Sequence, residues 1–232
     1  MNAHVEKARG AEVPAALIRL DEASLADHIY LSGSDRCAFL AQYCSGGSGR
    51  RNGPCHQLIR DFKCEPSRAF RDRRCGRHKQ EAIATMSSWL RQAVPRRLVE
   101  SCTWVPVPPS QQADDPDFDD RLERTLLLAF ESYDVDIRSL LFQTRSTSRD
   151  HAGRARLSEQ ALLDILRVDK SQLMPRAVRE RVVLFDDVLT SGKHFKCCER
   201  RLREVLPDTP IAGIFLMRRA PPRDRRSLGR AW

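Results

Sequence analysis

The stretch RVVLFDDVLTSGKH, residues 181–194, combines a run of apolar residues with two adjacent carboxylates and a short polar turn. The apolar run over residues 182–185 is typical of a strand that is buried on both faces of a sheet. Asp186 and Asp187 then stand at the carboxyl end of that strand, which is where open α/β sheets bind their ligands. The stretch therefore predicts a central strand that leads directly into a binding site.

The turn after the carboxylates has the composition of a phosphate-binding site. Thr190 and Ser191 carry hydroxyls, Gly192 permits a tight turn, and a helix is expected from about Phe195. Free N–H groups at a helix N-terminus bind a phosphate monoester, and Lys193 adds positive charge. Because carboxylates accept hydrogen bonds from sugar hydroxyls, the whole stretch indicates a ribose 5-phosphate.

The rest of the chain from residue 102 onward alternates between strand and helix patterns. Strands are expected over 102–110, 136–144, 181–185 and 210–217, and helices over 79–94, 120–133, 157–168 and 195–206. This alternation predicts an α/β fold with a mostly parallel sheet flanked by helices. The acidic segment before the second helix, residues 113–121, is interpreted as a solvated loop, although it could also help to bind a metal or a cationic partner.

Residues 1–78 show little sustained periodicity and are predicted to form an irregular N-terminal extension, with the α/β domain over 79–232. Five cysteines lie in this extension: Cys37, Cys44, Cys55, Cys64 and Cys75. Structural zinc is not expected, because no paired C-x-x-C motif supplies the close ligands that it needs. Cys197 and Cys198 are expected to be core residues, and no disulfides are expected.

The composition fits a folded protein with an anionic partner. The chain has 232 residues, of which 41% are hydrophobic and 31% charged, with a net charge of +9. Such a charge attracts nucleotides, phosphorylated metabolites or nucleic acid, although it is equally typical of a generally basic surface. With no apolar run long enough for a bilayer and no signal peptide, a cytoplasmic protein that does not enter a membrane is expected.

VVLFDDVLTSGKH resembles the signature of the type I phosphoribosyltransferases, and the chain from WVPVPPS to IAGIFLMRR is similar to the ComF-like members of that family. The resemblance implies binding of phosphoribosyl pyrophosphate with Mg²⁺. It also implies transfer of ribose 5-phosphate to a nitrogenous base or related acceptor, which is a glycosyltransferase reaction of nucleotide metabolism. The hood that recognises the base would have to come from residues 1–78.

The resemblance also assigns roles to individual residues. Asp186 and Asp187 become the sugar contacts, the catalytic candidates and candidate contacts for Mg²⁺. The phosphoribosyl contacts are Asp186, Asp187, Val188, Leu189, Thr190, Ser191, Gly192, Lys193 and His194. The pyrophosphate contacts, chiefly through the backbone, are Val107, Pro108, Pro109 and Ser110. A mobile loop would carry Arg145, Arg149, His151 and Arg154. His194 departs from the threonine usual in the family, so its role stays open.

The same residues also allow simpler structural interpretations and functions other than phosphoribosyl transfer. The prolines at 106–109 alone are typical of a rigid turn, and the arginine-rich loop alone is as typical of a solvated basic loop. The runner-up function is a non-catalytic regulatory or defence-associated protein that senses a nucleotide. A nucleic-acid-binding adaptor is secondary, because aromatic residues make up only 6% and no reading helix is recognisable. Exchanging both Asp186 and Asp187 for asparagine is expected to abolish ligand binding and leave the fold intact.

Overall fold

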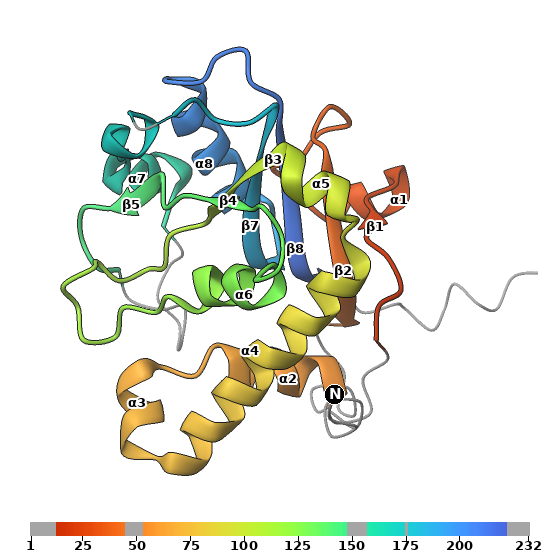
Figure 1. Ribbon diagram of the computed structural model, residues 1–232, viewed down its shortest axis with the longest axis vertical. Coiled ribbons are helices and arrows are strands. Elements are labelled where there is room, and N and C mark those ends of the chain that lie inside the picture. The colour runs from red at the N-terminus through yellow and green to blue at the C-terminus, as the bar shows by residue number, and fades with distance from the viewer. Residues whose placement is uncertain (1–12, 45–52, 148–156, 175, 222–232) are drawn as a thin grey trace, which may run out of the picture.

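Six strands form a mostly parallel sheet in the computed structural model, which describes residues 13–44, 53–147, 157–174 and 176–221 (Figure 1). In sheet order they are β1 (Ile18–Arg19), β2 (Cys37–Cys44), β8 (Ile211–Ala220), β7 (Arg181–Leu189), β3 (Cys102–Pro106) and β4 (Asp136–Ile137). Every neighbouring pair is parallel except β1 with β2. The predicted α/β class with a mostly parallel sheet is confirmed.

β7 lies inside the sheet and is longer than predicted. On one side β3 ends at Pro106, which pairs with Phe185. On the other side β8 stays paired with β7 as far as Leu189. The prolines after residue 105 cannot donate to a ladder, which explains why β3 stops first. Asp186 and Asp187 therefore lie within β7, just after the point where β3 ends and β7 has no neighbour on that side.

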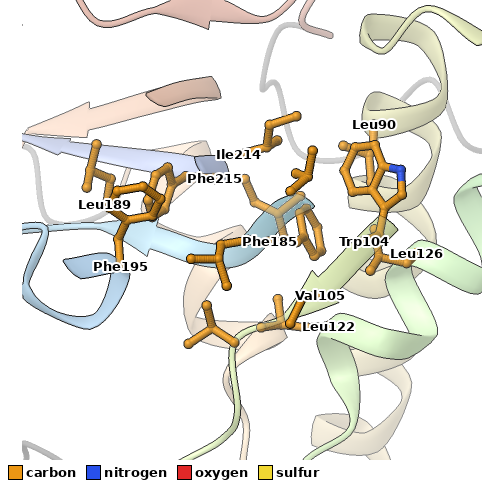
Figure 2. Packing of buried hydrophobic residues seen from close by; sticks show 14 of the residues in the cluster. Leu90, Trp104, Val105, Leu122, Leu126, Phe185, Leu189, Phe195, Ile214 and Phe215 are labelled. Atoms are coloured by element: carbon orange, nitrogen blue, oxygen red, sulfur yellow. The ribbon is translucent and has the colours of Figure 1, made fainter. Parts of the chain in front are cut away.

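One face of the sheet is covered by α4 (Arg73–Ala93) and α6 (Arg121–Ala129), which pack against each other. On this face the Phe185 ring meets Trp104 edge-on with ring centroids 6.3 Å apart (Figure 2). The Trp104 ring centroid also lies 5.0 Å from that of Phe130 at the end of α6. Each such buried aromatic side chain contributes about 2 to 3 kcal/mol relative to an exposed one. This cluster fixes β7 against the helices.

The other face is covered by α8 (Lys193–Arg203). Phe195 of α8 packs against Phe215 of β8, with ring centroids 6.3 Å apart (Figure 2). Phe215 stands opposite Asp186 in the ladder, so Asp186 shares this face. Because successive strand residues point to opposite faces, Asp187 points toward α4 and α6.

The N-terminal region belongs to the same fold, which corrects the predicted irregular extension. β2 lies beside β8 in the main sheet, and the boundary drawn after residue 78 falls inside α4. The shorter helices are α1 (Glu22–Leu25), α2 (Pro54–Phe62), α3 (Pro66–Arg71), α5 (Arg96–Ser101), α7 (Glu159–Ile165) and a 3₁₀ helix over Lys170–Leu173. CAFLAQYC, residues 37–44, is a strand that lacks strict alternation, and its pairing with β8 rather than its own pattern defines it.

Two predicted elements are interrupted. The strand over 136–144 divides into β4, which pairs with β3 in the main sheet, and β5 (Leu141–Gln143), which is not part of that sheet. The helix over 157–168 ends at Ile165, and β6 (Leu166–Val168) pairs with β5 in a separate two-stranded sheet. In both places tertiary contacts override the local periodicity.

Candidate functional site

The turn that follows β7 contains a left-handed glycine. Gly192 has φ +84° and directly precedes α8. A Cβ atom at this position would lie 2.6 Å from Cγ of Leu31, so only glycine fits without strain. Among the described residues, the amides of Ser191 and Gly192 donate to no protein acceptor. Together with the N-terminus of α8, this turn has the arrangement of an anion-binding site.

The N-terminal segment supports the turn from the opposite side. His28 is completely buried, and its Nδ1 donates to the carbonyl oxygen of Thr190. Arg218 of β8 donates through Nε to His28 Nε2 at 3.0 Å, so the imidazole is neutral. Burial lowers the pKa of His28 although its hydrogen bond to Thr190 opposes the shift. The amide of Tyr30 donates to the carbonyl oxygen of Ser191 at 3.1 Å.

Asp187 is buried among cations. Lys63 Nζ lies 2.8 Å from its Oδ1, and Arg121 Nη2 lies 2.5 Å from its Oδ2. Arg121 also pairs with Asp119 at 2.7 Å, and Lys79 contacts the same Asp119 oxygen at 2.8 Å. Burial raises the pKa of the Asp187 carboxyl, but Lys63 and Arg121 outweigh this and hold the pKa well below its ordinary value. We refer to these five residues as the Asp187 network.

The Asp187 network changes three expectations. Both oxygens of Asp187 already accept hydrogen bonds from protein cations, so the two aspartates are not equivalent sugar contacts. Removing the charge of Asp187 would leave Arg121 with Asp119 as its one remaining carboxylate partner, so the double asparagine variant is not expected to leave the fold intact. The acidic segment 113–121 is not wholly solvated either, because Asp119 is buried.

Asp186 is the carboxylate that faces the open side of the site. Its side chain is half-buried, and Oδ1 accepts a hydrogen bond from the amide of Asp187 at 2.7 Å. In the described part of the chain, no lysine or arginine forms an ion pair with it. Burial, followed by the charge of Asp187, raises the pKa of Asp186 to about 7. A carboxyl group perturbed in this way is a candidate for a functional role.

These groups line one cavity with a volume of about 570 Å³. Its wall includes all of the predicted phosphoribosyl contacts, residues 186–194, and all of the predicted pyrophosphate contacts, residues 107–110. Its basic side chains are Lys63, Arg121, Arg145, Lys193 and His194. A cavity of this size and charge suits a phosphorylated small molecule.

The loop after β5 adjoins the same cavity. Arg145 lines it, and the amide of Thr147 donates to the carbonyl oxygen of Ser110 at 2.7 Å. Lys193 is partly engaged, because its Nζ donates to the carbonyl oxygen of Leu157. Three further residues predicted for this loop lie outside the described residues: Arg149, His151 and Arg154.

Sequence reasoning did not identify the residues that support the site. Lys63, Lys79 and Arg121 occur among many other basic residues, and His28 lies 162 residues from Thr190. One signal was available, since Asp119 stands two residues before Arg121, the first residue of α6. That local pattern indicates a helix start rather than a buried ion pair.

The cysteines take no part in the cavity. All eight are unpaired thiols, and Cys197 and Cys198 are buried in α8 as predicted. Burial raises the pKa of Cys37 to about 12 and that of Cys197 to about 11, so neither thiol is activated. Within residues 13–44, 53–147, 157–174 and 176–221, no three His, Cys, Asp or Glu side chains are grouped to hold a metal.

No protein-family model matches the chain, and no curated protein is significantly similar to it. Among the helices of the described residues, none combines the length and apolar character needed to cross a membrane.

Proposed function

We propose that the protein binds phosphoribosyl pyrophosphate with Mg²⁺ in this cavity and transfers ribose 5-phosphate to a nitrogenous acceptor. The observation that carries the proposal is the convergence of three features on one basic cavity of about 570 Å³. These features are the glycine turn at the N-terminus of α8, the Asp186 carboxylate and the prolyl loop over residues 107–110. The resemblance of residues 182–194 to the type I phosphoribosyltransferases points to the same ligand.

The turn supplies the groups that a 5-phosphate needs. The Ser191 and Gly192 amides are available as donors, and the Thr190 and Ser191 hydroxyls can add two more hydrogen bonds. The positive end of the dipole of α8, which has 11 residues, favours an anion at the same place. His28 and Tyr30 hold the carbonyl groups of the turn on the other side, which leaves its amides facing the ligand.

Asp186 is the residue that would contact the ribose hydroxyls and Mg²⁺. Mg²⁺ is commonly held by one or two carboxylates together with the phosphates of the substrate, so the lack of a three-residue cluster among the described residues is compatible with it. The half-buried Asp186 has no cationic side chain paired with it in this region, and a divalent cation would offset its unfavourable ionisation. When bound, Mg²⁺ would neutralise charge on the pyrophosphate.

The transfer itself needs little covalent chemistry from the protein. A nitrogen lone pair of the acceptor forms a bond to the anomeric carbon, and pyrophosphate departs with the electron pair of the broken C–O bond. Asp186 would orient the ribose hydroxyls and stabilise the positive charge that develops on the ring. Arg145 and the loop over 107–110 would hold the leaving group, and positioning of the two reactants would supply much of the rate.

Calorimetric titration with phosphoribosyl pyrophosphate and Mg²⁺ tests the proposal. Asp186→Asn should weaken binding by about tenfold or more, because a hydrogen bond to a charged group is lost. Asp164→Asn, the same change at an exposed position on α7, should not alter the affinity. Equal affinities for the wild type and Asp186→Asn, or no binding to the wild type, would refute the assignment.

A second candidate is a sensor that binds the ligand without turnover. It is favoured by the Asp187 network, because Asp187 forms ion pairs with Lys63 and Arg121. Of the two adjacent aspartates, only Asp186 then has no ion pair among the described residues. Release of pyrophosphate in the presence of a nucleobase distinguishes the two functions. Saturable binding with no release would support the sensor.

A further inference from the structure

A second cavity adjoins the first on the far side of the prolyl loop. It has a volume of about 590 Å³ and shares the wall formed by residues 107–109. β5 closes another side of it, together with the segment that leads into α6. The size lies within the range of small-molecule binding sites.

The walls of this second cavity are largely apolar and aromatic. Leu122 and Leu141 are buried, whereas the rings of Phe118 and Phe142 are 38% and 45% exposed. Two partly exposed aromatic rings at one cavity offer stacking surface to a planar ligand.

The second cavity is more acidic than the first. In the part of the chain that the structure describes, its lining includes no lysine and no arginine. Its lining does include the carboxylates of Asp114, Asp120, Glu123 and Asp169. For a protein of net charge +9 this is an unusual concentration of negative charge, and it disfavours an anionic ligand.

Gln143 gives the cavity a specific polar group. Gln143 is 7% exposed and is one of the residues that line the cavity. Its Oε1 is buried and has no hydrogen-bond partner. An unsatisfied buried carbonyl costs about 1 to 3 kcal/mol, so this position is unfavourable for folding alone. Rotation of the carboxamide can direct either its oxygen or its NH₂ group toward a ligand.

We propose that the second cavity binds a small aromatic compound that is neutral or cationic and carries a nitrogen-bearing group. Its ring would pack against Phe118 and Phe142, and its amide or amine would hydrogen-bond to Gln143. The acidic rim would exclude the corresponding carboxylate. This inference stands apart from the proposed phosphoribosyl function, because none of its evidence concerns the basic cavity.

Three probes of one size test the inference on the full chain: benzamide (neutral), benzamidine (cationic) and benzoate (anionic). Ligand-observed NMR should detect benzamide and benzamidine with dissociation constants of about a millimolar, as expected for fragments of this size. Benzoate should bind about tenfold more weakly or not at all, since like charges oppose it. Failure of both nitrogen-bearing probes to bind, or equal binding of benzoate, would overturn the inference.

Substitutions locate the binding. Gln143→Leu should weaken benzamide about tenfold, and it should still fold because it removes an unsatisfied polar group. Gln92→Leu, the same change at an exposed position on α4, is the matched control and should have no effect. Ala113→Trp, at an exposed position in the cavity wall, should block all probes. Unchanged benzamide affinity in both Gln143→Leu and Ala113→Trp would place the binding elsewhere.

Discussion

Replacing Asp186 with asparagine should stabilise the fold while it weakens the binding of phosphoribosyl pyrophosphate. The structure raises the pKa of Asp186 from 3.8 to about 7, which corresponds to about 4 kcal/mol of unfavourable ionisation. Water that reaches the half-buried carboxylate reduces this value, so we expect a gain on the order of 1 to 2 kcal/mol at pH 8. Asparagine keeps an oxygen that can accept the hydrogen bond from the amide of Asp187.

The pKa of Asp186 also predicts how the stability difference between the wild type and Asp186→Asn changes with pH. Because the folded-state pKa is raised, the native protein holds a proton on Asp186 between pH 4 and pH 7 that the unfolded chain has released. The contribution of Asp186 to wild-type stability is therefore lost as pH rises through this window, and the variant lacks this contribution. Urea denaturation at pH 5 and pH 8 should show a larger gain for Asp186→Asn at pH 8. A loss of stability at pH 8, or a gain that does not depend on pH, would refute the reasoning.

The neighbouring residue provides a control of opposite sign. Asp187→Asn should destabilise the fold by about 2 to 4 kcal/mol at pH 7, since it removes the buried carboxylate that pairs with Lys63 and with the buried Arg121, which would keep Asp119 alone. The depressed pKa of Asp187 makes its stabilising contribution present at neutral pH and lost as the pH falls below about 4. If both single variants shifted stability in the same direction, the two aspartates would not have the different environments described above.

Three further outcomes follow from the contacts around the site. Gly192→Ala should destabilise the protein by about 1 to 3 kcal/mol, because residue 192 has a positive φ and a Cβ atom there would collide with Leu31. The same change should weaken the binding of phosphoribosyl pyrophosphate. Denaturation measures the first effect and calorimetry the second. Since the pKa of His28 is lowered, the contribution of His28 to stability should fall as pH drops below about 6.5, and denaturation across pH 5 to 7 should show that His28→Gln lacks this contribution. Lys79→Met should lower the free energy of unfolding by about 3 kcal/mol, because it removes a cation that pairs with the buried Asp119.

The central strand and the turn were predictable because their signals are local. Apolar residues 182–185 have few places to lie except inside a sheet, and a glycine before a helix indicates a turn whatever surrounds it. The same local reasoning ended β7 too early, because the length of a strand depends on its neighbour. β8 stays paired with β7 through Leu189, and that pairing joins segments far apart in the chain.

The environment of the carboxylates was not predictable, because it is assembled from distant positions. Arg121 lies 66 residues from Asp187, and His28 lies 190 residues from Arg218. Lysine and arginine together number 40, so the sequence gives no reason to select Lys63 or Arg121 among them. Their ion pairs with Asp187 distinguish them, and those ion pairs form only in the folded chain.

The two adjacent aspartates acquire different properties because a strand alternates its faces. Asp187 points toward α6 and is neutralised by Lys63 and Arg121, whereas Asp186 points toward α8 and lacks such a partner among the described residues. Because those two cations keep Asp187 ionised, its charge adds to the cost of ionising Asp186. An uncharged residue at position 186 would therefore make the folded state more stable. The binding of a cation or of a sugar hydroxyl is a physical role that explains a carboxylate at this position, and packing does not.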